Sequence, residues 1–399
     1  MKEVIAMAKR IRANVNPGIL VWARQTAGYS LEEAAHKIGT SIERLQAWES
    51  GDAKPTLRQL REAGRVYRRP SALFYRHTTP EQPQTLPDFR LLSDANVEIR
   101  PDLRFEIRRA FARRAIALEI SEQLGEQPPQ FHFETEMSEP PDSLAGRIRE
   151  LLQITIEEQH SWSDHYEALR AWTTAIERTG VLVFQTGNVD VNQMRGFSIS
   201  RKPFPVVAVN GKDSPRGRIF TLIHEFVHIA LDKSGICDLH DNDLDVDHTV
   251  ETYCNRVAGE VLVPKEALLS ETIVRQNYNN NWDDYQISHL SNRYMVSKEV
   301  ILRRLLILGK TSEAEYRRKR CEFIEAYKQQ QTGKSGYVPY FRKVLRNNGA
   351  AYTNLVLSAY YNEAISSRDL SNFLGGIKLE HIPAIEQALL TSVERGEEF

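Results

Sequence analysis

The segment TLIHEFVHIALD, residues 221–232, contains residues whose types and spacing fit metal-dependent chemistry. A helix places His224 and His228 one turn apart on the same side, where both imidazoles can bind one Zn²⁺. Glu225 then lies beside the open coordination position as a candidate general base. The flanking residues are apolar, so the alternative is a pair of hydrogen-bonded histidines in a hydrophobic core.

A catalytic zinc ion needs a third protein ligand. Glu251 is the strongest candidate, because it follows His228 by 23 residues and opens the amphipathic stretch VETYCNRVAGEVLVP. On a helix Asn255 lies one turn further on the same side, where it can orient that ligand. His248 is the competing candidate for the third ligand.

The strand before the HExxH segment is predicted to bind substrate. FPVVAVN, residues 204–210, reads as a strand, and Pro203 and Pro205 at its start favour an edge position because proline cannot donate to a ladder. An edge strand can hold an extended peptide by strand addition. The residues expected to do so are Val206, Val207, Ala208 and Val209.

The chemistry predicted for this site is the attack of a water on the carbonyl of a bound peptide. The zinc ion polarises the scissile carbonyl and activates the water, and Glu225 moves the proton to the leaving amine. The attack leaves an oxyanion, and the sequence does not decide which side chain stabilises it besides zinc. Four side chains are equal candidates for additional support: Arg216, Arg218, His240 and His248. Residues 240–248 carry alternating carboxylates but lack the glycine and final glutamate of a Ca²⁺ loop, so we expect an acidic loop there.

The N-terminal segment has the pattern of a helix-turn-helix bundle. Gly28, Gly39 and Gly51 end successive short helices, and Ser30 with Glu33 forms a predicted capping box. Residues 1–75 carry thirteen Lys or Arg against seven Asp or Glu, a local field that suits DNA. Dimerisation or docking of a partner is the alternative role.

This segment resembles the Xre/Cro-like helix-turn-helix family. The resemblance rests on LxxAAxxIGTSIxRLQAWExG, residues 31–51, and on the Pro-Thr-Leu that follows. It implies that residues 41–47 enter the major groove. There Arg44 would contact guanine and Ser41 a base or phosphate.

A second resemblance covers about 115 residues around HExxH and points to the ImmA/IrrE family of zinc metallopeptidases. It runs from GFS at Gly196 through PVVAVN and FTLIHEFVH to ExxCNxxAxExLVP, and more weakly through LSNRYMVSKEVILRRLLILG. It implies His224, His228 and Glu251 as zinc ligands and Glu225 as catalytic base. Its implied substrates are proteins, typically DNA-binding repressors cleaved in a stress or mobile-element response.

A long helix is predicted at about residues 102–124, and it is rich in arginine. At about 100° per residue the arginines scatter around the helix instead of lining one side. We therefore predict a solvated, partly ion-paired helix and not a nucleic-acid surface. The residues concerned are Arg104, Arg108, Arg109, Arg113 and Arg114.

The whole chain of 399 residues has a formal net charge of −1 and no apolar run long enough for a membrane span. Its three cysteines are widely spaced, which favours reduced thiols, so a cytoplasmic protein with no membrane partner is expected. The predicted fold class is α+β: an all-α helix-turn-helix bundle, a zincin-like peptidase domain with a small sheet, and a C-terminal helical module. The expected boundaries are 1–79 for the bundle, 80–142 for a linker and helical arm, 143–312 for the peptidase domain and 313–399 for the module.

Two functions follow from these features. The first is a cytoplasmic zinc endopeptidase that cleaves a specific protein, such as a DNA-binding repressor or antitoxin, with DNA bound through the N-terminal domain. The second is a DNA-binding regulator or antitoxin whose zinc domain senses or binds a partner without turnover. A homodimer is compatible with both.

Overall fold

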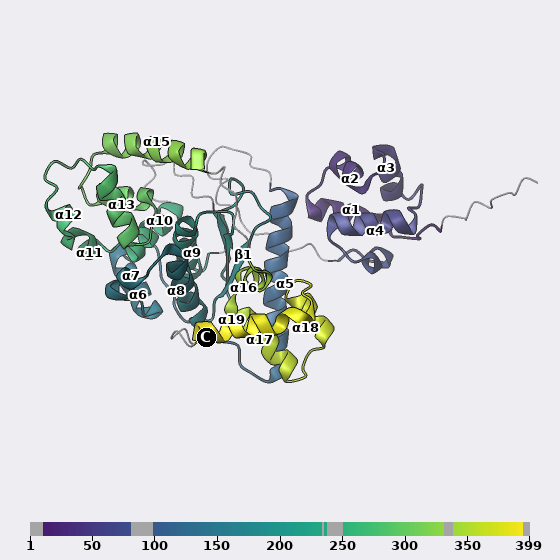
Figure 1. Cartoon of the computed structure of the whole chain (residues 1–399). Helices are drawn as coiled ribbons and strands as arrows, with labels where there is room; N and C mark the ends of the chain where they lie inside the picture. The colour runs from purple at the N-terminus through teal and green to yellow at the C-terminus, as the bar shows by residue number, and fades with distance from the viewer. Residues whose placement is uncertain (1–10, 81–98, 234, 238–249, 331–337, 394–399) are drawn as a thin grey trace, which may run out of the picture. The chain divides into compact units, whose positions relative to one another are not determined.

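The computed structural model describes residues 11–80, 99–233, 235–237, 250–330 and 338–393 of the chain. The chain folds as two compact units, the first within residues 1–85 and 96–109 and the second within 86–95 and 110–399. Each has its own buried core. The fold class is α+β, with N-terminal helix-turn-helix helices, a small sheet with the HExxH helix in the central region, and C-terminal helices (Figure 1). Among the described helices, none is both long and apolar enough to cross a bilayer.

The first unit is a bundle of short helices, each ended by a local signal. Ser30 accepts a hydrogen bond from the Glu33 amide in the predicted capping box, and Gly28, Gly39 and Gly51 adopt left-handed conformations that end three helices. The elements are α1 (Pro17–Ala27), α2 (Leu31–Ile38), α3 (Ile42–Ser50), α4 (Leu57–Tyr67) and the 3₁₀ helix η1 (Ser71–Tyr75).

The Trp-Glu-x-Gly sequence at the end of α3 has a structural role. Trp48 is fully buried in the core of the first unit. Glu49 accepts two hydrogen bonds from the Arg24 guanidinium of α1, at 2.8 and 2.9 Å. These contacts fix α3 against α1 and leave the opposite face of α3 in solvent.

Helix α5 (Pro101–Leu124) has the predicted bounds. It is partly ion-paired as predicted, since Arg109 contacts Glu106, but the prediction that the arginines are solvated is wrong for Arg108, Arg113 and Arg114. In the first unit Arg108 donates to the carbonyls of Tyr67 and Arg68, which end α4. In the second unit Arg114 donates to four carbonyls of residues 201–204, and the buried Arg113 donates to the Asn347 carbonyl. These three arginines therefore satisfy backbone carbonyls of neighbouring segments.

The second unit is built on a four-stranded sheet in the order β1-β3-β2-β4. Strand β3 pairs in parallel with β1 and antiparallel with β2, and β4 pairs antiparallel with β2. Both faces are covered, since the residues of β1, β2 and β3 are all buried. The strands are β1 (Leu182–Thr186), β2 (Gly196–Ile199), β3 (Val206–Asn210) and β4 (Gly235–Cys237).

The edge position predicted for β3 is wrong. The strand is hydrogen-bonded on both sides, and its residues Val206, Val207, Ala208 and Val209 are at most 3% exposed. Pro203 and Pro205 precede the paired residues, so their missing N–H groups cost the ladder nothing. A peptide cannot add to this strand, and among the described strands the outer ones are β1 and β4.

Helices surround this sheet. Helices α8 and α9 pack on it on one side, while α16 and α17 pack against β1 (Figure 1). Helices α7, α11 and α12 and strand β4 are too short to have been recognised in the sequence. The helices from the middle of the unit are α6 (Pro141–Leu152), α7 (Ile156–Ser161), α8 (His165–Arg178), α9 (Pro215–Ala230), α10 (Val250–Leu262), α11 (Lys265–Ser270), α12 (Thr272–Arg275), α13 (Asp284–Arg293), α14 (Lys298–Ile307) and α15 (Glu313–Gln330).

The C-terminal part is helical, as predicted. Its elements are α16 (Tyr340–Asn348), α17 (Ala350–Tyr361), α18 (Ser367–Phe373), η3 (Leu379–His381) and α19 (Ile382–Val393). A buried carboxylate, Glu177 of α8, lies close to Gly349, which separates α16 from α17. Burial raises its pKa to about 8, against the opposing effect of the backbone amides of Ala351, Val183 and Ala350.

We expect Glu177 to make the stability of the second unit depend on pH. The folded chain keeps a proton on this group up to about pH 8, whereas an unfolded glutamate loses it near pH 4.3. Stability from this group is therefore complete below about pH 4 and falls by about 1.4 kcal/mol per pH unit until about pH 8. Denaturant unfolding at pH 5.5 and 7.5 should show this loss in the wild type and not in Glu177→Gln. Identical pH slopes for the two chains would contradict it.

Candidate metal centre

Helix α9 presents the HExxH residues inside the core. Ser214 caps it by accepting a hydrogen bond from the Gly217 amide at 3.0 Å, and Pro215 occupies the first turn, where its missing N–H is harmless. From Thr221 to Ala230 every side chain is buried. The helix can be apolar all round because β2, β3, α8 and α10 pack against it.

Three side chains from α9 and α10 converge on one point. His224 and His228 have Nε2 atoms 3.1 Å apart, and each lies 3.2 Å from an oxygen of Glu251. One potential ligand atom from each of the three residues lies within 4.8 Å of the other two. A zinc tetrahedron with bonds of about 2.0–2.2 Å has edges of about 3.3–3.6 Å. The residues therefore fit a zinc ion with one coordination position left open.

The charges of the three side chains are strongly coupled. Burial opposes ionisation of Glu251, but hydrogen bonds from His224 and His228 outweigh it and hold the pKa of this carboxyl well below its usual range. Burial lowers the pKa of both histidines. At His224 the interactions with Glu251 outweigh burial, so its pKa is raised. At His228 burial outweighs them, so its pKa is lowered. Zinc requires an ionised carboxylate and neutral imidazoles as ligands. The lowered pKa of Glu251 and of His228 favours these forms, whereas zinc would have to displace a proton from His224.

Glu225 lies next to the metal-binding residues and is completely buried. Its carboxylate contributes to the raised pKa of the neighbouring His224. It follows His224 directly in α9, so its side chain points to a different side of the helix, toward β2.

Asn255 occupies the predicted position one turn after Glu251. The side chain is 9% exposed, and it contributes to the raised pKa of His224. This contribution makes His224 a second ligand that Asn255 can orient, beside the glutamate of its own helix. Both roles stay predictions.

Two supports of the centre were missed in the sequence because they come from the irregular segment before α6. The Tyr253 hydroxyl of α10 donates to the Glu139 carbonyl at 2.8 Å. Phe226 of α9 contacts Phe131 edge to face, with ring centroids 5.7 Å apart. These contacts attach both ligand-bearing helices to one segment, residues 131–139.

The arginines considered for oxyanion support are engaged elsewhere. Arg216 donates to Ser291 and Asn292 of α13, at 2.6 and 2.7 Å, and Arg218 donates to Gln185 of β1 at 2.8 Å. They precede His224 by eight and six residues, about 12 and 9 Å along the helix axis. Both arginines thus fix the start of α9. His240, His248 and the predicted acidic loop lie outside the described residues.

In the first unit the predicted DNA-contacting residues are at the start of α3. Ser41 caps the helix by accepting a hydrogen bond from the Arg44 amide at 3.3 Å, which leaves its hydroxyl hydrogen able to reach a phosphate. The side chains of Ser41 and Arg44 are exposed, whereas Leu45 and Trp48 on the opposite face of α3 are buried. The reading face predicted for α3 is therefore the one in solvent.

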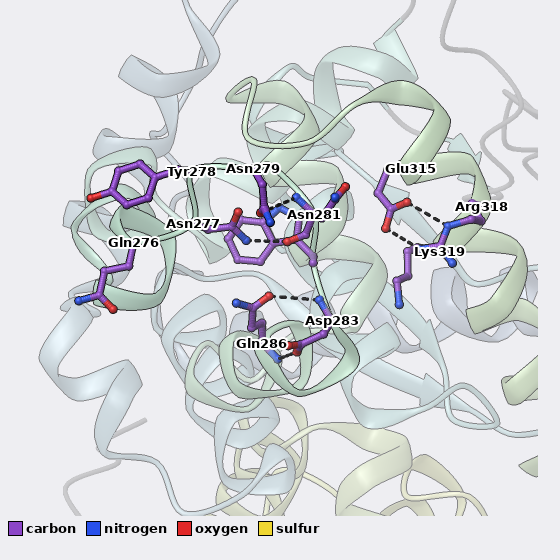
Figure 2. Close-up of a pocket in the computed structure, with 11 residues that line it drawn as sticks. Gln276, Asn277, Tyr278, Asn279, Asn281, Asp283, Gln286, Glu315, Arg318 and Lys319 are labelled. Carbon is purple, nitrogen blue, oxygen red and sulfur yellow. Dashed lines mark hydrogen bonds and ion pairs between the residues drawn. The ribbon is translucent and has the colours of Figure 1, made fainter.

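A surface hollow of about 820 Å³ is separate from the metal centre (Figure 2). Its charged side chains pair locally, as Arg318 does with Glu315 at 2.6 Å and Lys319 with Asp284 at 2.7 Å. Its lining is otherwise dominated by amides. The lining residues are Gln276, Asn277, Tyr278, Asn279, Asn281, Trp282, Asp283, Gln286, Glu315, Arg318 and Lys319.

Two segments match known protein families. Residues 176–306 match the IrrE N-terminal-like domain, a peptidase family, and residues 20–74 match a helix-turn-helix domain. The first match covers the four strands and the helices that carry the metal-binding residues; the second covers most of α1 and the whole of α2, α3 and α4. Both resemblances seen in the sequence are confirmed. Comparisons with curated proteins and with solved structures found no match.

Proposed function

From a chain that carries an IrrE N-terminal-like peptidase domain and a helix-turn-helix domain, we propose a cytoplasmic zinc endopeptidase that cleaves a specific DNA-binding protein. The substrate would be a repressor or an antitoxin, cleaved in a stress or mobile-element response. The observation that carries the proposal is the convergence of His224, His228 and Glu251 beside a buried Glu225.

Each of these residues has a defined part in the proposed reaction. His224, His228 and Glu251 hold the ion, and Asn255 orients His224. A bound zinc ion supplies a Lewis acid and an activated water. Glu225 takes the proton from the attacking water and gives it to the leaving amine, because its carboxylate is next to the ligands and shielded from solvent.

The DNA-binding unit explains how a protease of modest peptide affinity can be selective. Ser41 and Arg44 would hold the chain on DNA, where a DNA-bound substrate is present at raised effective concentration. Loss of the DNA contact would then weaken cleavage in cells without changing the chemistry.

The alternative is a transcription regulator whose zinc domain binds a partner without turnover. The two functions differ in their response to one pair of variants, tested with a reporter promoter that responds to the wild-type chain. For the protease, Glu225→Gln abolishes the response. For the regulator, Glu225→Gln leaves it intact while Arg44→Ala eliminates it.

DNA binding itself is tested with the sites recovered by chromatin immunoprecipitation of the wild-type chain. Removing a guanidinium that contacts guanine costs about 1–3 kcal/mol, so Arg44→Ala should weaken binding by about 5- to 150-fold. Arg61→Ala, an exposed arginine of α4, is the control. If Arg44→Ala binds these sites as tightly as the control, α3 does not read DNA through this residue.

A further inference from the structure

Strand β2 begins at a glycine that faces the HExxH helix. Gly196 pairs with Val209 of β3 on one side and with Cys237 of β4 on the other, so its backbone is held from both edges. Thr221 and Glu225 lie one turn apart on α9 and both approach this position. The contact joins the sheet to the helix beside the metal-binding residues.

A side chain at position 196 would occupy the place of the Glu225 carboxylate. A Cβ added to Gly196 would lie 2.7 Å from Glu225 Oε1, 3.0 Å from Glu225 Cγ and 2.5 Å from Thr221 Cγ2. Ordinary contacts of this kind are about 3.5–4.0 Å, so the carboxylate would have to move by about 0.8 Å or more. Gly196 is not among the glycines of the described chain that have a positive φ. Glycine is therefore needed at this position for space and not for backbone conformation.

We infer that Gly196 is a positioning residue for Glu225. The side chain of Glu225 lies against the bare backbone of β2, which limits where its carboxylate can go on that side. Neither β2 nor α9 can retreat easily, because β2 is paired on both edges and α9 is buried on all sides. The inference rests on the proposed function, since it assigns a role in placing the catalytic base.

The expected effect is on turnover and not on metal binding. Misplacing a reacting group by about 1 Å costs about 100-fold in rate. Gly196→Ala should therefore lower kcat about 100-fold with KM unchanged, while the zinc content per chain stays close to that of the wild type. The unfolding midpoint should fall, because the added methyl group is overpacked against Thr221 and Glu225. The peptide substrate spans a cleavage site identified from new protein N-termini that appear in cells with the wild-type chain and not with Glu225→Gln.

Three further variants separate positioning from packing. Gly187→Ala is the matched control, because a Cβ there meets nothing within 4 Å, and it should behave as the wild type. In a Glu225→Gln background Gly196→Ala should cause no additional loss, because the group that it displaces no longer acts. Gly196→Ala/Thr221→Ser removes the conflict with the threonine methyl and keeps the conflict with Glu225. It should still have low kcat, and it replaces the single variant if that one fails to fold.

Wild-type kcat in Gly196→Ala would overturn the inference, and so would full recovery of kcat in Gly196→Ala/Thr221→Ser, which would assign the effect to the threonine. An undiminished additional loss in the Glu225→Gln background would also overturn it. Failure of the proposed function has a different sign: the wild-type chain would then produce no N-termini that are absent with Glu225→Gln.

Discussion

Glu225→Gln should abolish cleavage while the chain keeps its zinc. The substitution retains the shape of a buried side chain and leaves His224, His228 and Glu251 in place. An amide cannot accept the proton from water, and general acid–base catalysis contributes about 10²- to 10⁴-fold. Turnover should therefore fall at least about 100-fold, measured with the peptide defined above, with one zinc ion per chain by elemental analysis.

The matched control is Glu266→Gln, an exposed glutamate of α11 in the same unit. It should have wild-type turnover and zinc content. Retention of zinc is essential to the interpretation, because loss of the ion would explain inactivity without a role for the base. Unchanged turnover in Glu225→Gln would remove this residue from the mechanism.

Glu251→Ala should remove the metal. The carboxylate supplies the third ligand, and two imidazoles 3.1 Å apart remain. Loss of an outer-shell partner alone costs about 10- to 100-fold in metal affinity, so loss of a ligand should cost more than about 100-fold. Added zinc should raise the unfolding temperature of the wild type, by mass action on the folded state, and raise that of the variant much less.

Glu266→Ala is the corresponding control and should respond to zinc as the wild type does. If Glu251→Ala binds zinc with wild-type affinity, the third ligand is another residue. His248, the alternative from the sequence, would then be the next residue to test.

The sequence predicted the centre well because its information is local. The spacing of His224 and His228 needs only a helix to place both rings on one side. Glu251 was inferred from its position at the start of an amphipathic stretch, and the structure places it against both histidines. The helix cap at Ser30 was equally local and was found where expected.

Features that depend on pairing between distant segments were not predictable in the same way. Pro203 and Pro205 indicated an edge strand, but the strand order is set by β1 and β2, which no local pattern in β3 specifies. The arginines of α5 appeared solvated, since their carbonyl partners lie up to 234 residues away. The role inferred for Gly196 likewise needs coordinates, because a glycine at a strand start has no local signature of the residue that it faces.

The most direct test of the central claim is a comparison of protein N-termini in cells that produce the wild-type chain or Glu225→Gln. We predict that new N-termini, in one DNA-binding protein or very few proteins, appear with the wild type and are absent with the variant. The purified variant must contain zinc in the same experiment. Identical sets of N-termini from the two chains would contradict the proposal that this site is a peptidase.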